Sequence, residues 1–127
     1  MMDVNTIYRD EVFSITGAET LEEAARRMRT NEVGSLVVMD DHRCVGIITE
    51  RDLTRAIADG EDPRRVDVSG YMTIRPITVT PDTGIREAAA EMLETEVRHL
   101  PVRVGGELIG MVSLRDLLDV VVDDENL

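Results

Sequence analysis

Hydrophobic residues along the chain follow two spacings, one typical of strands and one typical of helices. Short β-branched runs predict strands at residues 13–16, 35–39, 44–49, 77–80, 100–104 and 108–113. Helical spacing first appears as Leu21-Ala24-Ala25-Met28 and Ile85-Ala88-Ala89-Met92, and again as Leu53-Ala56-Ile57 and Leu117-Leu118-Val121. Thr20 and Glu23 fit a capping box at the start of the first helix. Strands and helices therefore alternate along the chain.

The same order of elements occurs twice, at an offset of 64 residues. Residues 14–53 align with residues 78–117 without a gap, and 13 of these 40 positions are identical. Several other positions exchange similar residues, such as Thr49 and Ser113. The chain is therefore an internal repeat of one strand–helix–strand–strand–helix unit.

The repeat predicts the domain organisation. We expect the first copy at residues 1–60, a linker at residues 61–70 and the second copy at residues 71–127, because Gly, Pro and charged residues gather between the copies. One copy of this length is marginal as an independent domain. We therefore expect the two copies to share one core.

One motif is repeated at the start of the last helix of each copy. GIITERD spans Gly46 to Asp52, and GMVSLRD spans Gly110 to Asp116. A hydroxyl followed three residues later by an aspartate is typical of a helix N-cap, which stabilises any helix by about 1 kcal/mol.

The same motif also suits a nucleotide. A glycine inside a strand indicates that another group approaches the backbone closely. Free N–H groups and a hydroxyl at a helix start can bind phosphate, and an acidic side chain nearby can accept the hydroxyls of a ribose. Capping and nucleotide binding both remain open at this point, since one oxygen can serve either.

Composition excludes several kinds of partner. The chain has 14 basic and 26 acidic residues, for a net charge of −12, so nucleic acids and anionic membranes are not expected partners. Aromatic residues make up only 2 % of the chain, so aliphatic side chains and methionine must build the core.

The sequence also gives little support for a metal site, a signal peptide or a transmembrane segment. Cys44 is the only cysteine, which rules out an internal disulfide. We interpret it and His42 as structural or solvent-facing rather than as metal ligands. The N-terminus lacks the apolar segment of a signal peptide, and no apolar run reaches the roughly 18 residues that span a bilayer. We expect a cytoplasmic protein.

Taken together, the residues resemble the cystathionine-β-synthase (CBS) domain family. The matching stretches are EVFSITGAETLEEAARRMRTNEVGSLVVMDDHRCVGIITERDL and YMTIRPITVTPDTGIREAAAEMLETEVRHLPVRVGGELIGMVSLRD. The resemblance covers nearly the whole chain and implies a tandem pair, also called a Bateman module. It implies a mixed α/β (α+β) fold in which two β-α-β-β-α repeats pack through their sheets with pseudo-twofold symmetry.

The resemblance also implies two ligand clefts. Asp52 and Asp116 are expected to hold ribose hydroxyls, with Thr49 and Ser113 at the phosphate end. The residues implied for the adenine pockets are Ile47, Thr73, Pro76, Ile77 and Val97 in one cleft, and Tyr8, Val12, Phe13, Val33, Gly34 and Met111 in the other.

Phosphate needs cations, and the candidates are Arg51, Arg98, His99 and Arg115. Arg98 is assigned to the cleft of Thr49 and Asp52, and His99 to that of Ser113 and Asp116. The first copy has Gly34-Ser35 where the second has Arg98-His99, so we expect unequal binding, with Ser113 and Asp116 as the first place to look for ligand.

The resulting hypothesis is a standalone regulatory module, not an enzyme and without a cofactor. It binds an adenine nucleotide (AMP, ADP or ATP) and signals energy or stress state by changing conformation, forms a homodimer and acts on a target protein that the sequence does not identify. The alternatives are an interaction module without ligand and a sensor of S-adenosylmethionine or NAD. No Ser/His/Asp set, P-loop or GxGxxG motif favours an enzyme.

Overall fold

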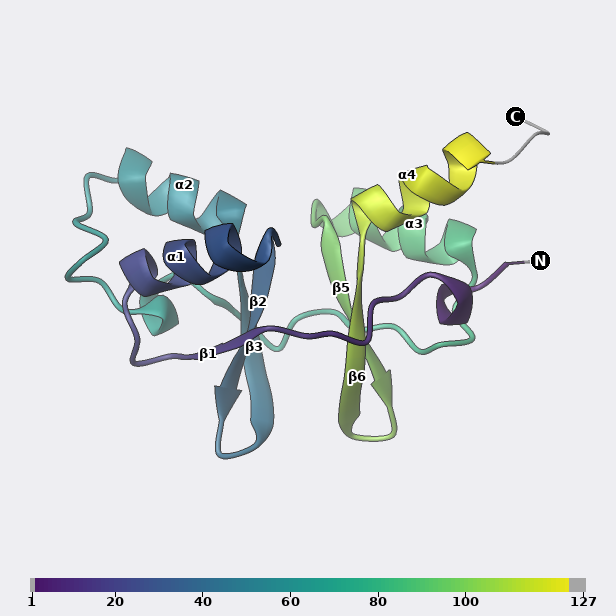
Figure 1. The fold of residues 1–127 in the computed structure, drawn as a ribbon, viewed down its shortest axis with the longest axis horizontal. Helices are drawn as coiled ribbons and strands as arrows, with labels where there is room; N and C mark the ends of the chain where they lie inside the picture. Colours follow the sequence, from purple (N-terminus) through teal and green to yellow (C-terminus); the bar gives the residue numbers. More distant parts are fainter. Residues whose placement is uncertain (1, 124–127) are drawn as a thin grey trace. The chain divides into compact units, whose positions relative to one another are not determined.

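The computed structural model describes residues 2–123, which form helices and strands in the repeated order strand–helix–strand–strand–helix (Figure 1). The α-helices are α1 (Leu21–Asn31), α2 (Glu50–Ala58), α3 (Ile85–Thr95) and α4 (Leu114–Asp123), with 3-10 helices η1 (Val4–Thr6) and η2 (Val68–Gly70). The strands are β1 (Ser14–Thr16), β2 (Ser35–Asp40), β3 (Arg43–Thr49), β4 (Thr73–Ile74), β5 (His99–Val104) and β6 (Glu107–Ser113). The predicted mixed α/β fold class is confirmed.

The chain folds into two compact units that differ from the two sequence repeats. Unit A is Phe13–Pro76, and unit B joins Met1–Val12 to Ile77–Leu127. The first residues of each repeat therefore pack in the unit that holds the body of the other repeat. The predicted limits at residues 60 and 71 follow the sequence repeat and do not describe this exchange.

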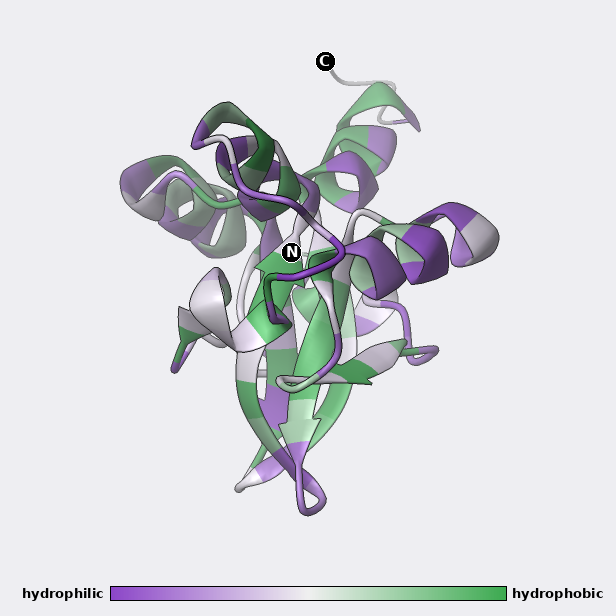
Figure 2. Ribbon diagram, turned by 90° about the vertical axis from the view of Figure 1, so that its left-hand side faces the viewer, coloured by the Kyte–Doolittle hydropathy of each residue, from purple (hydrophilic) through white to green (hydrophobic). Residues whose placement is uncertain are grey.

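Both units use the same strand order. In unit A the order is β1-β2-β3-β4, with β1 parallel to β2 and the other pairs antiparallel. In unit B, β5 and β6 form the hairpin, Val79 bridges Val102 in parallel and Arg9 bridges Met111 in antiparallel. The hairpins are largely hydrophobic, whereas each helix carries both polar and apolar residues (Figure 2). The helices thus have the two-faced character that their spacing predicts.

The strand predicted at residues 77–80 is reduced to the single bridge at Val79. In unit A the N–H of Val37 donates to the carbonyl of Phe13, at 3.0 Å. The position equivalent to Val37 is Pro101, which has no N–H to donate to Ile77. Loss of this donor explains why the pairing is shorter in unit B.

Each unit has a hydrophobic cluster built from its own residues. The unit A cluster is Ile15, Leu21, Ala24, Met28, Leu36, Val38, Ile48, Ala56 and Val68. The unit B cluster is Val4, Val79, Ala88, Met92, Leu100, Val102, Val112 and Leu117. Val68 lies in η2, shortly before β4, and Val4 lies in η1 of the N-terminal segment. Both are fully buried, so each of these segments contributes a side chain to the core of its unit.

Residues 61–70, predicted as the linker, are part of unit A. Leu21 N donates to Val66 O at 2.9 Å and Glu22 N donates to Pro63 O at 3.0 Å. These bonds satisfy N–H groups in the first turn of α1, where helices leave donors without intrahelical partners. The segment therefore caps α1 from outside the helix while Val68 enters the core.

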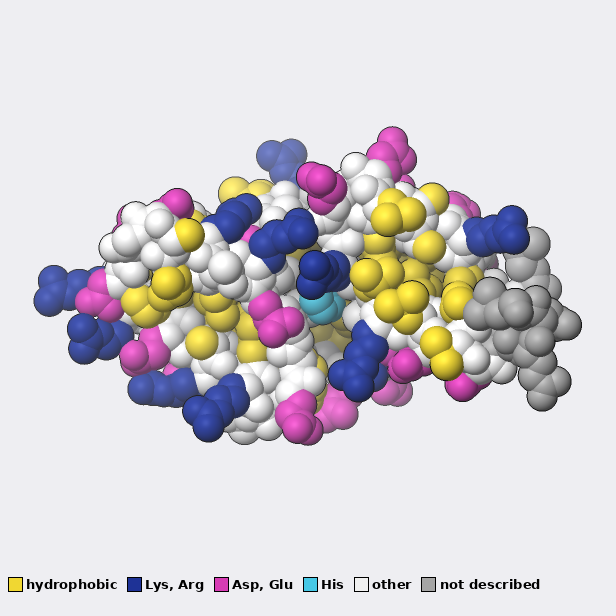
Figure 3. Space-filling model, turned by 90° about the horizontal axis from the view of Figure 1, so that it is seen from above, with side chains coloured by type: hydrophobic (Ala, Val, Ile, Leu, Met, Phe, Trp, Pro, Cys, Tyr) yellow, Lys and Arg dark blue, Asp and Glu magenta, His cyan; other side chains and the backbone are white. Residues whose placement is uncertain are grey.

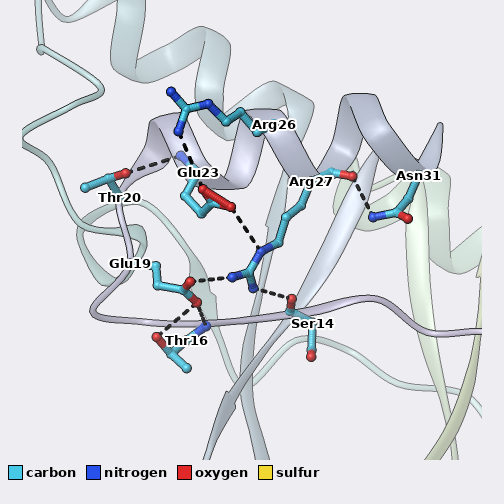
Figure 4. A network of polar contacts seen from close by, with 8 residues as sticks. All are labelled: Ser14, Thr16, Glu19, Thr20, Glu23, Arg26, Arg27 and Asn31. Carbon is cyan, nitrogen blue, oxygen red and sulfur yellow. Dashed lines mark hydrogen bonds and ion pairs between the residues drawn. The ribbon is translucent and has the colours of Figure 1, made fainter.

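A polar network fastens β1 to α1 (Figure 4). Arg27 donates to the carbonyl of Ser14 at 2.9 Å and pairs with Glu19, whose Oε2 accepts from the N–H of Thr16 at 2.9 Å. These bonds hold the pKa of Glu19 below its usual value, chiefly through the backbone N–H of Thr16 and then through the positive charge of Arg27.

The start of α1 is capped as predicted, but the capping box is incomplete. Thr20 Oγ1 accepts from Glu23 N at 3.2 Å. The carboxylate of Glu23 is instead shared between Arg26, at 3.7 Å, and Arg27, at 3.5 Å.

Among residues 2–123, no helix is long and apolar enough to cross a membrane.

Candidate functional site

Thr49 and Asp52 form a complete capping box where β3 ends and α2 begins. Asp52 Oδ2 accepts from Thr49 N at 2.8 Å and from Thr49 Oγ1 at 3.1 Å, and Thr49 Oγ1 lies 3.4 Å from the N–H of Asp52. The side chain of Asp52 is 6 % exposed. The capping interpretation of this motif is confirmed.

Ser113 and Asp116 repeat this geometry between β6 and α4. Asp116 Oδ2 accepts from Ser113 N at 2.8 Å and from Ser113 Oγ at 2.9 Å, and Ser113 Oγ accepts from Asp116 N at 3.2 Å. We refer to these two places as the Thr49–Asp52 site and the Ser113–Asp116 site. In both, the cap uses Oδ2 and leaves Oδ1 for another partner.

The Oδ1 atoms of the two aspartates have different partners. Asp116 Oδ1 accepts from Nε of Arg9, at 3.1 Å, and Arg9 belongs to the exchanged N-terminal segment. Asp52 Oδ1 lies 3.4 Å from a terminal nitrogen of Arg55, one turn further along α2. Because a buried carboxylate needs a charged or hydrogen-bonding partner, each unit supplies an arginine, but from a different element.

Arg55 also lies over an aromatic ring. Its guanidinium lies 5.9 Å from the centre of the Tyr71 ring, and Tyr71 donates its hydroxyl hydrogen to Asp59 Oδ2 at 2.7 Å. That hydrogen bond, followed by partial desolvation, raises the pKa of Tyr71 to about 12. The cation of the Thr49–Asp52 site is therefore held against an aromatic ring.

The N–H groups expected to be free at the helix starts are largely used. Glu50 N donates to Gly34 O at 3.0 Å, and Leu114 N donates to Arg98 O at 2.8 Å. The N–H groups of Asp52 and Asp116 bond to the capping hydroxyls. These four N–H groups therefore have partners within the protein, and phosphate binding at the helix starts stays a prediction.

The two glycines of the motif, Gly46 and Gly110, are each approached closely by another part of the backbone. A Cβ at Gly46 would lie 2.7 Å from the carbonyl oxygen of Thr73, and a Cβ at Gly110 would lie 2.5 Å from that of Arg9. The close approach predicted from glycine in a strand is confirmed, but the group that approaches is the exchanged segment of the chain itself.

The other predicted residues divide between the units. Unit A holds Phe13, Val33, Gly34, Ile47, Arg51, Thr73 and Pro76 together with the Thr49–Asp52 site. Unit B holds Tyr8, Val12, Ile77, Val97, Arg98, His99, Met111 and Arg115 together with the Ser113–Asp116 site. The resemblance assigns Arg98, Val97 and Ile77 to the site of unit A and Phe13, Val33 and Gly34 to that of unit B, so each implied cleft draws on both groups.

Several of these residues have definite neighbours within their unit. Thr73 pairs with Ile47 in the sheet of unit A, and His99 pairs with Ser113 in the hairpin of unit B. Phe13 and Val33 pack against the core of unit A, and Tyr8 and Val97 against that of unit B, so these four side chains are partly committed to folding. Arg51, Arg98 and Arg115 are exposed.

Arg9, Arg55 and Tyr71 were missed by sequence reasoning. Arg9 is the equivalent of Thr73 at the offset of 64, so extending the repeat upstream would have identified it. The repeat does not identify Arg55 and Tyr71, because Asp119 and Ile7 occupy the equivalent positions.

Among residues 2–123, no group of three His, Cys, Asp or Glu side chains could hold a metal ion.

The profile of the CBS domain family matches the chain twice, at residues 4–59 and 68–123. The chain is a tandem pair of CBS domains. The two matches are offset by 64 residues and begin at η1 and η2, so the family unit includes the segments that the two structural units exchange.

The chain is similar to proteins of several organisms. An uncharacterized 17.7 kDa protein of Acidianus ambivalens is 40 % identical over 124 residues, which cover 94 % of this chain and 73 % of the relative. The mitochondrial CBS domain-containing protein CBSX3 of Arabidopsis thaliana is 36 % identical over 115 residues, 86 % of this chain and 56 % of the relative. This pair therefore spans about half to three quarters of the length of these two relatives.

Solved structures share the fold. The CBS-domain containing protein ATU1752 from Agrobacterium tumefaciens superposes with a TM-score of 0.90 at 27 % identity, covering 94 % of this chain and 99 % of that chain. The CBS domain pair of protein MJ0100, in complex with 5′-methylthioadenosine and S-adenosyl-L-methionine, superposes with a TM-score of 0.87 at 22 % identity, over 96 % and 97 % of the two chains. The predicted family and fold are thus confirmed.

Proposed function

We propose that this CBS pair is a regulatory module that binds an adenine nucleotide, AMP, ADP or ATP, first at the Ser113–Asp116 site. The observation that carries the proposal is the buried carboxylate of Asp116, whose Oδ2 is fixed by the cap while Oδ1 is bound by the exposed Arg9. A hydrogen-bond acceptor oriented in this way suits the hydroxyls of a ribose.

Two further points support an adenosyl ligand. The MJ0100 pair, which shares this fold, is complexed with two adenosyl compounds. The regulatory effect would follow from a difference in affinity between two conformations, because a ligand shifts an equilibrium only by that difference. In unit B, a change at Asp116 would reach the N-terminal segment directly through Arg9.

Isothermal titration with AMP, ATP, NAD and S-adenosylmethionine tests this proposal. We expect saturable heat with at least one adenine nucleotide and a matching rise in thermal stability, since a ligand that binds only the folded state stabilises it. Mass spectrometry of small molecules released from the purified protein would identify a ligand that is already bound. No heat with any adenosyl compound would contradict the proposal.

The capping geometry supports a second candidate, an interaction module without ligand. The four oxygens of Asp52 and Asp116 all have partners within the protein, so neither carboxylate needs a ligand to be satisfied. In either case we propose binding rather than catalysis, and a phosphate-release assay with ATP should give no turnover.

We also propose that the module pairs with a second copy through α3 and α4. Apolar side chains gather on this surface (Figure 3). Leu118, Val121 and Val122 form a stripe at helical spacing on α4, and Leu93 of α3 is 79 % exposed. Exposed apolar clusters of this kind mark interaction surfaces, and a self-complementary patch produces a symmetric dimer.

A further inference from the structure

Arg9 is held at the Ser113–Asp116 site by its backbone. Its N–H donates to Met111 O at 2.8 Å, and its carbonyl accepts from Met111 N at 2.9 Å. Met111 lies two residues before Ser113 on β6, so the start of the Arg9 side chain is fixed beside the capping box. The guanidinium reaches Asp116 while the side chain remains 62 % exposed.

The bond to Asp116 uses only part of the guanidinium. Nε donates to Oδ1 at 3.1 Å, and within residues 2–123 the two terminal nitrogens make no other hydrogen bond or ion pair. Arginine carries five N–H donors in a planar fork that matches phosphate. Four donors of this largely exposed side chain therefore remain for a ligand, next to a carboxylate suited to ribose.

The Thr49–Asp52 site lacks this arrangement. The position equivalent to Arg9 is Thr73, which carries no charge, and Arg55 lies against the ring of Tyr71. In a chain with a net charge of −12, an anion is repelled at long range, so a local cation decides where phosphate binds. Of the two sites, the Ser113–Asp116 site therefore has an arginine, Arg9, whose backbone pairs with β6 beside the capping box.

The geometry points to Arg9 as the residue that makes the Ser113–Asp116 site select phosphorylated adenosines over adenosine itself. Ribose hydroxyls replace Nε of Arg9 at Oδ1 of Asp116, and the guanidinium pairs with the phosphate of the same ligand. Neither the buried carboxylate nor the guanidinium is left without a partner in the bound state, which keeps the exchange favourable. This inference rests on the proposed function and adds the residue that selects the phosphate of its ligand.

Titration of AMP and of adenosine into the wild type, Arg9→Gln and Arg9→Lys tests the inference. We expect Arg9→Gln to weaken AMP binding by about tenfold to a hundredfold, in line with the loss of charge-assisted hydrogen bonds, and to change adenosine binding by less than about threefold. Arg9→Lys should recover part of the AMP affinity, since it keeps the charge without the fork. Arg86→Gln, an exposed arginine on α3, removes the same charge and should leave both affinities unchanged.

Two outcomes would overturn the inference alone. One is an equal loss of AMP and adenosine affinity in Arg9→Gln, and the other is tighter binding of both ligands, which would make Arg9 only an obstacle at Asp116. Adenosine affinity and the thermal unfolding midpoint report whether each variant is folded. A wild type that binds neither ligand would instead overturn the proposed function, and this inference with it.

Discussion

The ring of Tyr8 covers Gly110 so closely that a Cβ at Gly110 would lie 2.3 Å from Cδ2 of Tyr8. The contact is made by the exchanged N-terminal segment, whose backbone also pairs with Met111. Gly110→Ala must therefore displace the segment or distort β6. We expect a loss of about 1–3 kcal/mol in the free energy of unfolding, typical of an overpacked site, measured by urea denaturation.

Gly106→Ala provides the matched control, because nothing lies within 4 Å of a Cβ at Gly106. We expect it to change stability by less than about 0.5 kcal/mol, as surface substitutions usually do. Equal effects of the two substitutions would show that the segment does not press on Gly110.

The pair Asp116→Ala and Asp52→Ala separates ligand binding from capping. Both variants lose a capping box, so both should lose about 1–2 kcal/mol of stability in thermal or urea unfolding. Only Asp116→Ala should abolish the heat of AMP binding at the higher-affinity site. Retention of that heat in Asp116→Ala, with its loss in Asp52→Ala, would move the proposed site to unit A.

The hydrogen bond from Tyr71 to Asp59 predicts an unusual tyrosine titration. Since Tyr71 has a pKa of about 12, it should remain protonated at pH 11 when followed by absorbance near 295 nm in a Tyr8→Phe background. Asp59→Asn should return the midpoint toward the ordinary value of about 10. The stabilisation from this bond is present below pH 10 and is lost as pH rises through 12, so an unshifted midpoint would contradict it.

The network of Glu19, Arg27 and Thr16 predicts a loss of stability in acid. Because the pKa of folded Glu19 is lowered, its contribution is complete above its usual pKa and is lost as pH falls through the folded value. Glu19→Gln should cost about 1 kcal/mol at pH 7 by urea unfolding, and the difference from the wild type should shrink at low pH.

Glu22→Gln is the control for this network. Glu22 pairs with Arg26 at 3.1 Å on the open face of α1, where a surface ion pair contributes about 0.5 kcal/mol or less. A constant difference between Glu19→Gln and the wild type from pH 7 to pH 3 would show that the charge of Glu19 is not what stabilises β1.

The apolar stripe on α4 predicts the oligomeric state. Sedimentation equilibrium of the wild type should give twice the chain mass of 14.2 kDa, and Leu118→Gln with Val121→Gln should give a monomer. Ile57→Gln on α2 also removes an apolar side chain that is 59 % exposed, and should leave the dimer intact. Dissociation by Ile57→Gln alone would place the interface elsewhere.

Local sequence accounts for much of the fold and for half of each candidate site. The repeat, the helical stripes and the Thr49–Asp52 and Ser113–Asp116 capping boxes were all predictable, because each depends on residues within a few positions of one another. The strand at residues 77–80 was overpredicted because Pro101, whose missing N–H shortens it, lies more than twenty residues away.

Tertiary structure alone decided what completes the Ser113–Asp116 site. The sequence by itself determined that two acidic capping boxes exist and that Arg55 follows Asp52 by one helical turn, a spacing at which the two side chains can pair. The fold determined that Arg9, 107 residues before Asp116, binds the other box and that the ring of Tyr71 lies beside Arg55. Nearly identical motifs thus carry different cations. A helix cap depends on residues within one turn of one another, whereas the ion pair between Arg9 and Asp116 forms only once the fold has brought distant segments together.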